Sequence, residues 1–133
     1  MAMSDDLTVE NWRNLSISLD ALGEAQHRLS ASKGFWTKAD GEAVTEDDVA
    51  EVASKIALVS GEAHELLEAW RMPDPWEHCG KEGCELDRMA EELADIQLRL
   101  VDLATFFCVD LGLAVKKKLE YNRGRVAMHG KRF

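Results

Sequence analysis

The segment from about residue 86 to residue 108 constrains the fold more than any other part of this 133-residue chain. On a helical projection its apolar side chains cover an arc of about 220° and leave one narrow polar strip. A helix with so wide an apolar surface has to be surrounded by protein. One small bundle cannot readily cover it, so we expect self-association into homodimers or homotetramers.

Three other segments also repeat apolar residues at three- and four-residue steps, which indicates helices. The predicted helices cover residues 7–30, 45–71, 86–108 and 110–122. Thr45 and Asp110 are the expected N-caps of the second and fourth helices, and Pro73 follows the end of the second. We predict an all-α fold, a four-helix antiparallel bundle, with residues 1–133 as a single domain.

The formal net charge of -9 argues against a nucleic-acid duplex or a membrane as partner, because both are polyanionic surfaces. The charge is unevenly distributed. Residues 1–115 hold 9 Lys and Arg against 24 Asp and Glu, whereas residues 116–133 hold 7 against 1. An acidic body with a basic tail can bind an anionic ligand through bridging divalent cations on one side and direct Lys or Arg contacts on the other.

No apolar run resembles a signal peptide or a membrane span, so we expect a cytoplasmic protein. The three cysteines, Cys79, Cys84 and Cys108, are too few for a disulfide framework. Together with His78, the first two indicate a metal loop, but a fourth ligand is missing and zinc is disfavoured there. We interpret Cys108 as a small core residue.

Two pairs of acids stand on the second and third predicted helices. Glu62 and Glu65 lie at the edge of one apolar face, and Glu92 and Asp95 lie in the polar strip of the next helix. Four carboxylates gathered inside a bundle are tolerable only with cations between them. Oxygen ligands favour Mg²⁺ or Mn²⁺ over zinc. A di-iron site is not expected, because it requires Glu-x-x-His on each of two helices and the chain does not have two such motifs.

The alternative is a solvated acidic surface held together by local ion pairs. Three pairs have the required four-residue spacing: Arg88 with Glu92, Asp95 with Arg99, and Glu51 with Lys55. Each would stabilise its helix by a few tenths of a kcal/mol. Spacing alone does not separate this interpretation from a metal site.

Glu62-x-x-Glu65, then 26 residues, then Glu92-x-x-Asp95 resembles the signature of the MazG-like, all-α nucleoside triphosphate pyrophosphohydrolases. "HRLSASKGFW" is similar to the His and Gly-Phe-Trp segment of some members and of the related dCTP pyrophosphatases. "KLEYNRGRVAMHGKRF" is similar to their C-terminal pattern. Gly61 departs from the family, which usually has one more glutamate at that position.

The resemblance implies hydrolysis of a (deoxy)nucleoside triphosphate to its monophosphate and pyrophosphate. Two or more Mg²⁺ ions, with Mn²⁺ as a substitute, would be held by Glu62, Glu65, Glu92 and Asp95. Either Glu62 or Glu65 would orient the attacking water as general base. The narrower alternative is a phosphoribosyl-ATP pyrophosphohydrolase or a dUTPase-like reaction. The alternative from another class is a catalytically silent helical-bundle interaction module.

The resemblance also implies substrate contacts. His27 and Trp36 would bind the base, and Lys118, Asn122 and Arg125 would contact phosphate or sugar. The structural alternatives are a Trp36 packed on the bundle, a His27 on a helix surface and a solvated Lys118.

Two further residues have simpler interpretations. Trp70 is predicted to lie in the core. Asp102 is predicted to pair with Arg99, or with Asn122 or Arg125 as a support to the site.

Overall fold

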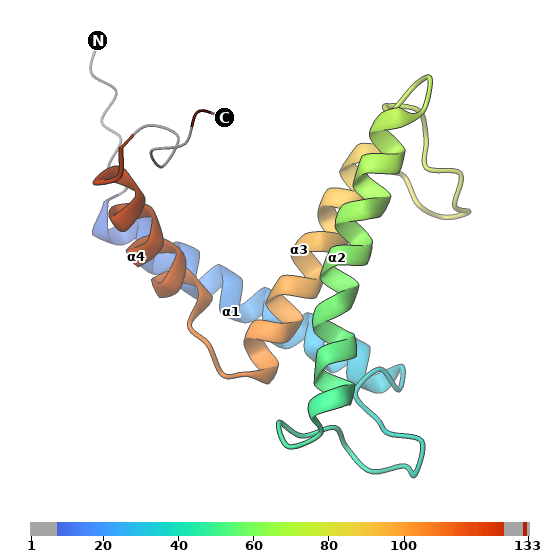
Figure 1. Cartoon of the computed structure of the whole chain (residues 1–133), viewed down its shortest axis with the longest axis horizontal. Helices are drawn as coiled ribbons and strands as arrows, with labels where there is room; N and C mark the ends of the chain where they lie inside the picture. Colours follow the sequence, from blue (N-terminus) through green and yellow to red (C-terminus); the bar gives the residue numbers. More distant parts are fainter. Residues whose placement is uncertain (1–7, 127–131, 133) are drawn as a thin grey trace.

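The computed structural model describes residues 8–126 and residue 132. This part of the chain forms four helices, α1 (Val9–Ser32), α2 (Val49–Arg71), α3 (Arg88–Phe106) and α4 (Leu111–Arg123) (Figure 1). The described residues contain two isolated β-bridges and no strand. The all-α, four-helix prediction is therefore confirmed. A search of the same residues finds no helix with the length and apolar character needed to cross a bilayer.

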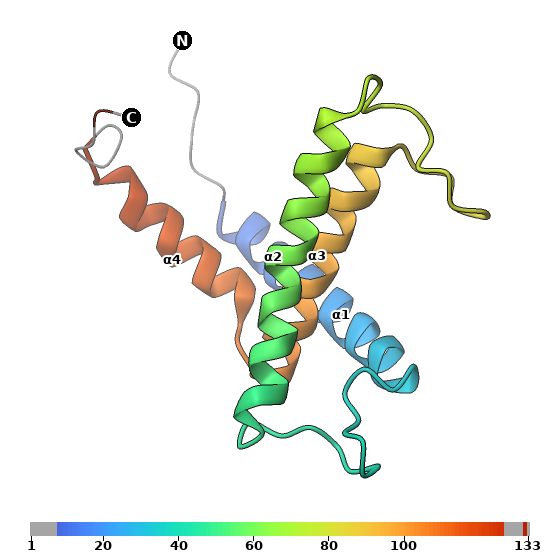
Figure 2. The ribbon, with the colours of Figure 1, turned by 45° about the vertical axis from the view of Figure 1, so that its right-hand side comes forward.

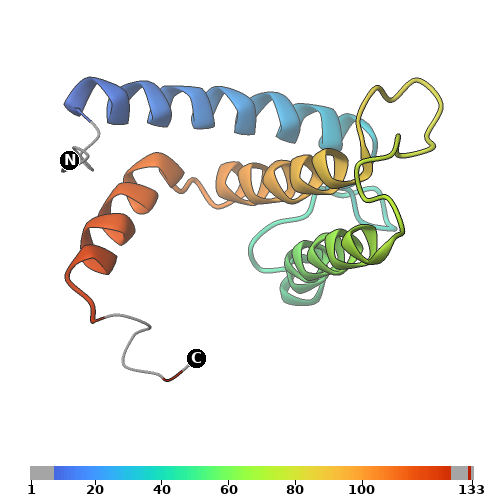
Figure 3. The same cartoon turned by 90° about the horizontal axis from the view of Figure 1, so that it is seen from above.

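Helix α3 is the centre of the arrangement. It packs against α1 on one side and α2 on the other, as the view from above shows (Figure 3). Helices α2 and α3 run antiparallel, whereas α4 packs mainly against α1 and leads away from the α2–α3 pair (Figures 1 and 2). The four helices of one chain thus form an open arrangement, and the closed antiparallel bundle that we predicted is not completed within the chain.

A glycine allows α1 and α3 to cross closely. Gly23 is buried, and a Cβ atom at this position would lie 2.9 Å from the carbonyl oxygen of Val101 and 2.3 Å from Oγ1 of Thr105. At the other end of α1, Gly112 of α4 lies directly against Ser16, where a Cβ would come within 2.6 Å of Cα. Both helix contacts therefore depend on residues without a side chain.

The helix starts follow from local hydrogen bonds. The predicted cap Asp110 is confirmed, since its carboxylate accepts the backbone N–H of Leu113 at 2.9 Å. The predicted cap Thr45 is wrong, because α2 begins only at Val49. Asp48 instead accepts the backbone N–H of Thr45 at 2.8 Å, which closes a turn before the helix. That hydrogen bond and the nearby ammonium of Lys38 lower the pKa of Asp48.

The main buried apolar cluster lies where the loop of residues 33–48 meets α2 and α3. Trp36, Val44 and Val52 are buried there. Around them pack four partly buried residues, Phe35, Leu103, Phe106 and Phe107. The loop of residues 33–48 therefore folds inward and supplies part of the core.

Several large apolar residues of α2 and α3 remain uncovered. Trp70, which we predicted in the core, is 59% exposed, so that prediction is wrong. Leu93 is 54% exposed, and Ile56, Leu67 and Leu100 are exposed as well. The chain exposes 9854 Å² in total, whereas a compact monomer of this mass exposes about 7,000 Å². Much of the apolar surface predicted from the sequence thus has no cover within one chain.

Cys108 also differs from its prediction. It is exposed rather than buried, and it adopts a left-handed backbone conformation with φ of 55° just after α3. The N–H of Val109 then donates to the carbonyl of Ala104 at 2.9 Å, a hydrogen bond that closes the helix end. The residue ends a helix instead of filling the core.

Candidate functional site

Helices α2 and α3 bring three of the predicted acids together. Ligand oxygens of Glu62, Glu65 and Glu92 all lie within 4.8 Å of one another. Glu62 is buried, Glu92 is half-buried and Glu65 is exposed, so the group opens to solvent on the Glu65 side. We call these three residues the carboxylate cluster. Asp95 follows Glu92 by one turn of α3, and the charge of Glu62 acts on it.

The carboxylate cluster is electrostatically strained. Burial and the neighbouring charges of Glu65 and Glu91 raise the pKa of Glu92. Burial and the charge of Glu62 likewise raise the pKa of Asp95. Oε2 of Glu92 is buried without a hydrogen-bond partner among the residues that the structure describes. A cation placed between these acids would relieve the repulsion and satisfy that oxygen.

Arg99 holds one member of the carboxylate cluster in place. Its Nε donates to Oε1 of Glu62 at 3.0 Å, and Nη2 forms an ion pair with the same oxygen at 3.0 Å, which links α3 to α2. The guanidinium also lies over the ring of Phe35, 5.0 Å from its centre. The local pair of Arg99 with Asp95 that we considered is therefore wrong.

The other two local ion pairs are also replaced. Arg88 donates to Glu77 at 2.9 Å instead of pairing with Glu92. The Lys55 ammonium lies over the Phe35 ring, 4.1 Å from its centre, and not on Glu51. Because the basic residues point elsewhere, the carboxylate cluster is not an acidic surface stapled by pairs within one helix.

Sequence reasoning missed Lys81, which comes from the long connection between α2 and α3. Its ammonium contacts Glu91. That hydrogen bond and the charges of Asp95 and Glu92 raise the pKa of Lys81. Lys81, Glu65 and Glu92 line one pocket of about 280 Å³. The length of the connection, residues 72–87, was the available signal, since connections of this size often carry function.

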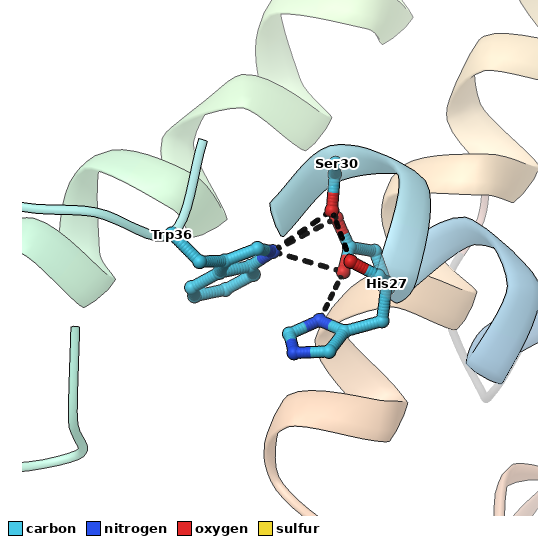
Figure 4. Close-up of polar contacts among 4 residues, drawn as sticks. His27, Ser30 and Trp36 are labelled. Carbon is cyan, nitrogen blue, oxygen red and sulfur yellow. Dashed lines mark hydrogen bonds and ion pairs between the residues drawn. The ribbon is translucent and has the colours of Figure 1, made fainter. Parts of the chain in front are cut away.

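A second polar group surrounds the buried Asp102, which is 2% exposed (Figure 4). Asp102 accepts hydrogen bonds from Nδ1 of His27 at 2.6 Å, Oγ of Ser30 at 2.8 Å and Nε1 of Trp36 at 3.0 Å. The pairings of Asp102 with Arg99, Asn122 or Arg125 that we considered are therefore wrong. The real partners lie 66 to 75 residues away along the chain.

The two predicted base-binding residues differ in how accessible they are to a ligand. Trp36 is only 5% exposed, and its ring stacks on Phe106 with the centres 4.3 Å apart, which is the packed alternative that we weighed. His27 remains partly exposed. Because the Asp102 carboxylate can only accept, Nδ1 of His27 carries a proton, and Nε2 is the ring nitrogen left for another molecule.

Two of the predicted phosphate- or sugar-binding residues, Lys118 and Asn122, lie on α4, the helix that leads away from the α2–α3 pair, and Arg125 follows the end of that helix (Figure 2). Lys118 and Arg125 both lie over the ring of Tyr121, at 4.7 Å and 5.7 Å from its centre. Asn122 is exposed on the same helix. One chain does not bring these residues to the carboxylate cluster. Residues 127–131 of the C-terminal pattern lie outside the described residues.

Comparison with protein-family models, curated proteins and solved structures gives no match to this chain. The MazG-like resemblance therefore stays a prediction from the sequence motifs.

Proposed function

We propose that this protein is a Mg²⁺-dependent hydrolase that converts a (deoxy)nucleoside triphosphate to its monophosphate and pyrophosphate. The proposal depends chiefly on the carboxylate cluster, where oxygens of three acids from two helices lie within 4.8 Å of one another and Oε2 of Glu92 is buried without a hydrogen-bond partner among the described residues. The order and spacing of the acids in the sequence support the same reaction.

The donor set fits magnesium. Glu62, Glu65, Glu92 and Asp95 offer only carboxylate oxygens, the ligands that Mg²⁺ prefers, and Mn²⁺ accepts them as well. Bound by these residues, the ions would supply positive charge that stabilises the leaving pyrophosphate and acidifies the attacking water.

The residues around the ions have distinct tasks in this proposal. Arg99 fixes the position of Glu62 through Oε1, so Glu62 serves as a rigid ligand. Glu65 is exposed and does not pair with Arg99. We therefore assign Glu65 as the general base that takes the proton of the attacking water. Lys81 stands beside the carboxylate cluster and would contact a phosphate oxygen.

The base would lie further along α3. Asp102 follows Asp95 by seven residues, which is about 10 Å of helix and comparable to the length of a nucleotide. His27, held by Asp102, would present Nε2 to an N–H group of the base. Trp36 would shape this end of the site from its buried position, which replaces the open stacking surface that we first expected.

The complete site would need a second copy of the chain. Lys118, Asn122 and Arg125 do not reach the carboxylate cluster of their own chain, and the apolar faces of α2 and α3 are uncovered. In a homodimer or homotetramer these faces would be buried, and α4 of a neighbour could supply the basic residues. Light scattering after size exclusion tests the assembly. The wild type should elute as an oligomer, and Leu93→Glu should shift it toward the monomer.

A substrate panel tests the reaction. Canonical and modified NTPs and dNTPs, with Mg²⁺ or with EDTA, would be assayed for pyrophosphate and monophosphate. We expect Mg²⁺-dependent release that is abolished by Glu65→Gln and Asp95→Asn. Glu51→Gln, an exposed acid at the start of the same α2, is the matched control and should retain full activity. Full activity in the first two variants would refute the proposed site, and inactivity of the wild type on all substrates would favour the interaction module.

A further inference from the structure

The connection between α2 and α3, together with the first turn of α3, contains a second cluster of potential metal ligands that the proposed reaction does not use. Ligand atoms of Cys79, Cys84 and Glu91 all lie within 4.8 Å of one another. The two cysteines are half-buried, and Glu91 is buried in the first turn of α3. We call these three residues the thiolate cluster.

The backbone of the loop brings the two cysteines together. His78 and Asp87 form an antiparallel bridge, and the N–H of Cys79 donates to the carbonyl of Leu86 at 3.0 Å. Inside this narrow base, the N–H of Cys84 donates to the carbonyl of Lys81 at 3.1 Å. Backbone hydrogen bonds therefore close the loop both at its base and at its turn, and the two cysteines face each other across it.

Two glycines make this turn possible. Gly80 directly follows the first cysteine with φ of 84°, and Gly83 directly precedes the second with φ of 77°. Residues with side chains rarely adopt these conformations. The sequence Cys-Gly-Lys-Glu-Gly-Cys thus encodes a turn that places two sulfur atoms side by side.

Glu91 can serve as a ligand although it also contacts the ammonium of Lys81. Lys81 reaches only Oε1 of Glu91, and a carboxylate can use its second oxygen for a metal.

The ligand chemistry distinguishes this cluster from the carboxylate cluster. Two soft sulfur ligands and one carboxylate select Zn²⁺, whereas Mg²⁺ prefers oxygen alone. We propose that Cys79, Cys84 and Glu91 bind one Zn²⁺ ion, which ties the loop to the first turn of α3. A water completes the tetrahedral set. His78 is not a ligand, because Nδ1 accepts the N–H of Gly80 at 3.0 Å and Nε2 contacts the carbonyl of Cys84.

The structure changes the set of ligands that the sequence suggested. The spacing of Cys79 and Cys84 offered two sulfur ligands, and the adjacent His78 was the natural third. The structure replaces His78 with Glu91, which lies 7 positions after Cys84 and on a different element. The zinc proposal is independent of the proposed hydrolase, since none of its ligands belongs to the carboxylate cluster.

Cobalt is the probe for the test. The full-length protein, reduced and stripped of metal, would be titrated with Co²⁺ and followed by absorbance. We expect the thiolate-to-cobalt charge-transfer band and the visible bands of tetrahedral Co²⁺ to saturate at one ion per chain, and Zn²⁺ to abolish them. Binding should also release thiol protons to solvent. A folded wild type that gives no such bands would overturn the proposal, and so would formation of a Cys79–Cys84 disulfide in place of metal binding.

Single variants assign the ligands. Cys79→Ser and Cys84→Ser should lose the charge-transfer band. Glu91→Gln should weaken Co²⁺ binding by at least about tenfold, because mutation of a residue that merely hydrogen-bonds to a metal ligand already lowers metal affinity by that much. Cys108→Ser is the matched control and should keep the band, with circular dichroism checking that every variant is folded. Glu65→Gln should also keep the charge-transfer band, so failure of the hydrolase proposal can be distinguished from failure of the zinc proposal. Bands that persist without both loop cysteines, or disappear without Cys108, would contradict the assignment.

Discussion

Replacing Gly23 with alanine perturbs the crossing of α1 and α3 by a single methyl group. In an exposed helix, alanine is more favourable than glycine by about 1 kcal/mol. At Gly23 the added Cβ would lie 2.3 Å from Oγ1 of Thr105 and 2.9 Å from the carbonyl oxygen of Val101. The threonine side chain can rotate away, but the carbonyl belongs to the backbone of α3, so the helices have to separate.

Overpacking of this kind typically costs about 1–3 kcal/mol. Gly61 in α2 is the matched control, because a Cβ there would meet nothing within 4 Å. Gly61→Ala should therefore gain about 1 kcal/mol in the free energy of unfolding. Gly23→Ala should be about 1–3 kcal/mol less stable than Gly61→Ala, the difference being the cost of the close contact.

Urea unfolding followed by circular dichroism measures both variants. With an m value of about 1–3 kcal/mol/M, the two midpoints should differ by about 1 M. A Thr105→Ala change added to Gly23→Ala should recover part of the loss, since it removes the nearer of the two contacts. Measurements at several protein concentrations separate self-association from helix packing. If Gly23→Ala is as stable as Gly61→Ala, the helices do not cross at Gly23.

Three further predictions follow from the structure. The raised pKa values of Glu92 and Asp95 mean that the folded protein binds more protons than the unfolded chain above their ordinary values of 4.5 and 3.8. The unfolding free energy of the metal-free protein should therefore fall as the pH rises above these values. The fall should be smaller in Glu92→Gln, and saturating Mg²⁺ should flatten the profile. An unchanged slope in Glu92→Gln would contradict this prediction. Asp102→Asn should lower the free energy of unfolding in urea by about 1–3 kcal/mol and shift the indole N–H resonance of Trp36, because an NH₂ group would replace one of the two oxygens that accept hydrogen bonds. An unshifted resonance would argue against the contact. Cys108→Gly should stabilise the protein by up to about 1 kcal/mol and so raise its melting temperature, because glycine adopts the left-handed backbone conformation without strain. Cys108→Ala should not raise it, and equal effects of the two changes would refute this reason.

Helices and their local ends were predictable because they depend on neighbours within one or two turns. The cap Asp110 was correct for this reason. Thr45 failed although its contact with Asp48 exists, since the same side-chain pairing can close a turn as well as start a helix. Periodicity also showed correctly that α3 is apolar over a wide arc, but it could not say which part of that arc one chain would cover.

The carboxylate spacing indicated that acids from two helices would meet, and oxygens of Glu62, Glu65 and Glu92 do lie together. The basic partners were not predictable in the same way. Arg99 had an acid at the correct spacing on its own helix, yet it donates to Glu62 on α2. Lys81 depends on the path of an irregular loop. Such contacts depend on how helices and loops dock, which no pattern along one helix records.

Helix α2 has one principal packed neighbour, α3, and this has a consequence for hydrogen exchange. Two packed helices flank α3, so its amide hydrogens should exchange only when most of the chain opens. The amides of α2 should exchange through a smaller opening that releases this helix from α3. Glu62 and Glu65 therefore stand on an element that opens before α3, and Glu92 stands on α3 itself. A cation that binds only the closed form should raise the protection of α2 selectively, in proportion to the logarithm of its concentration.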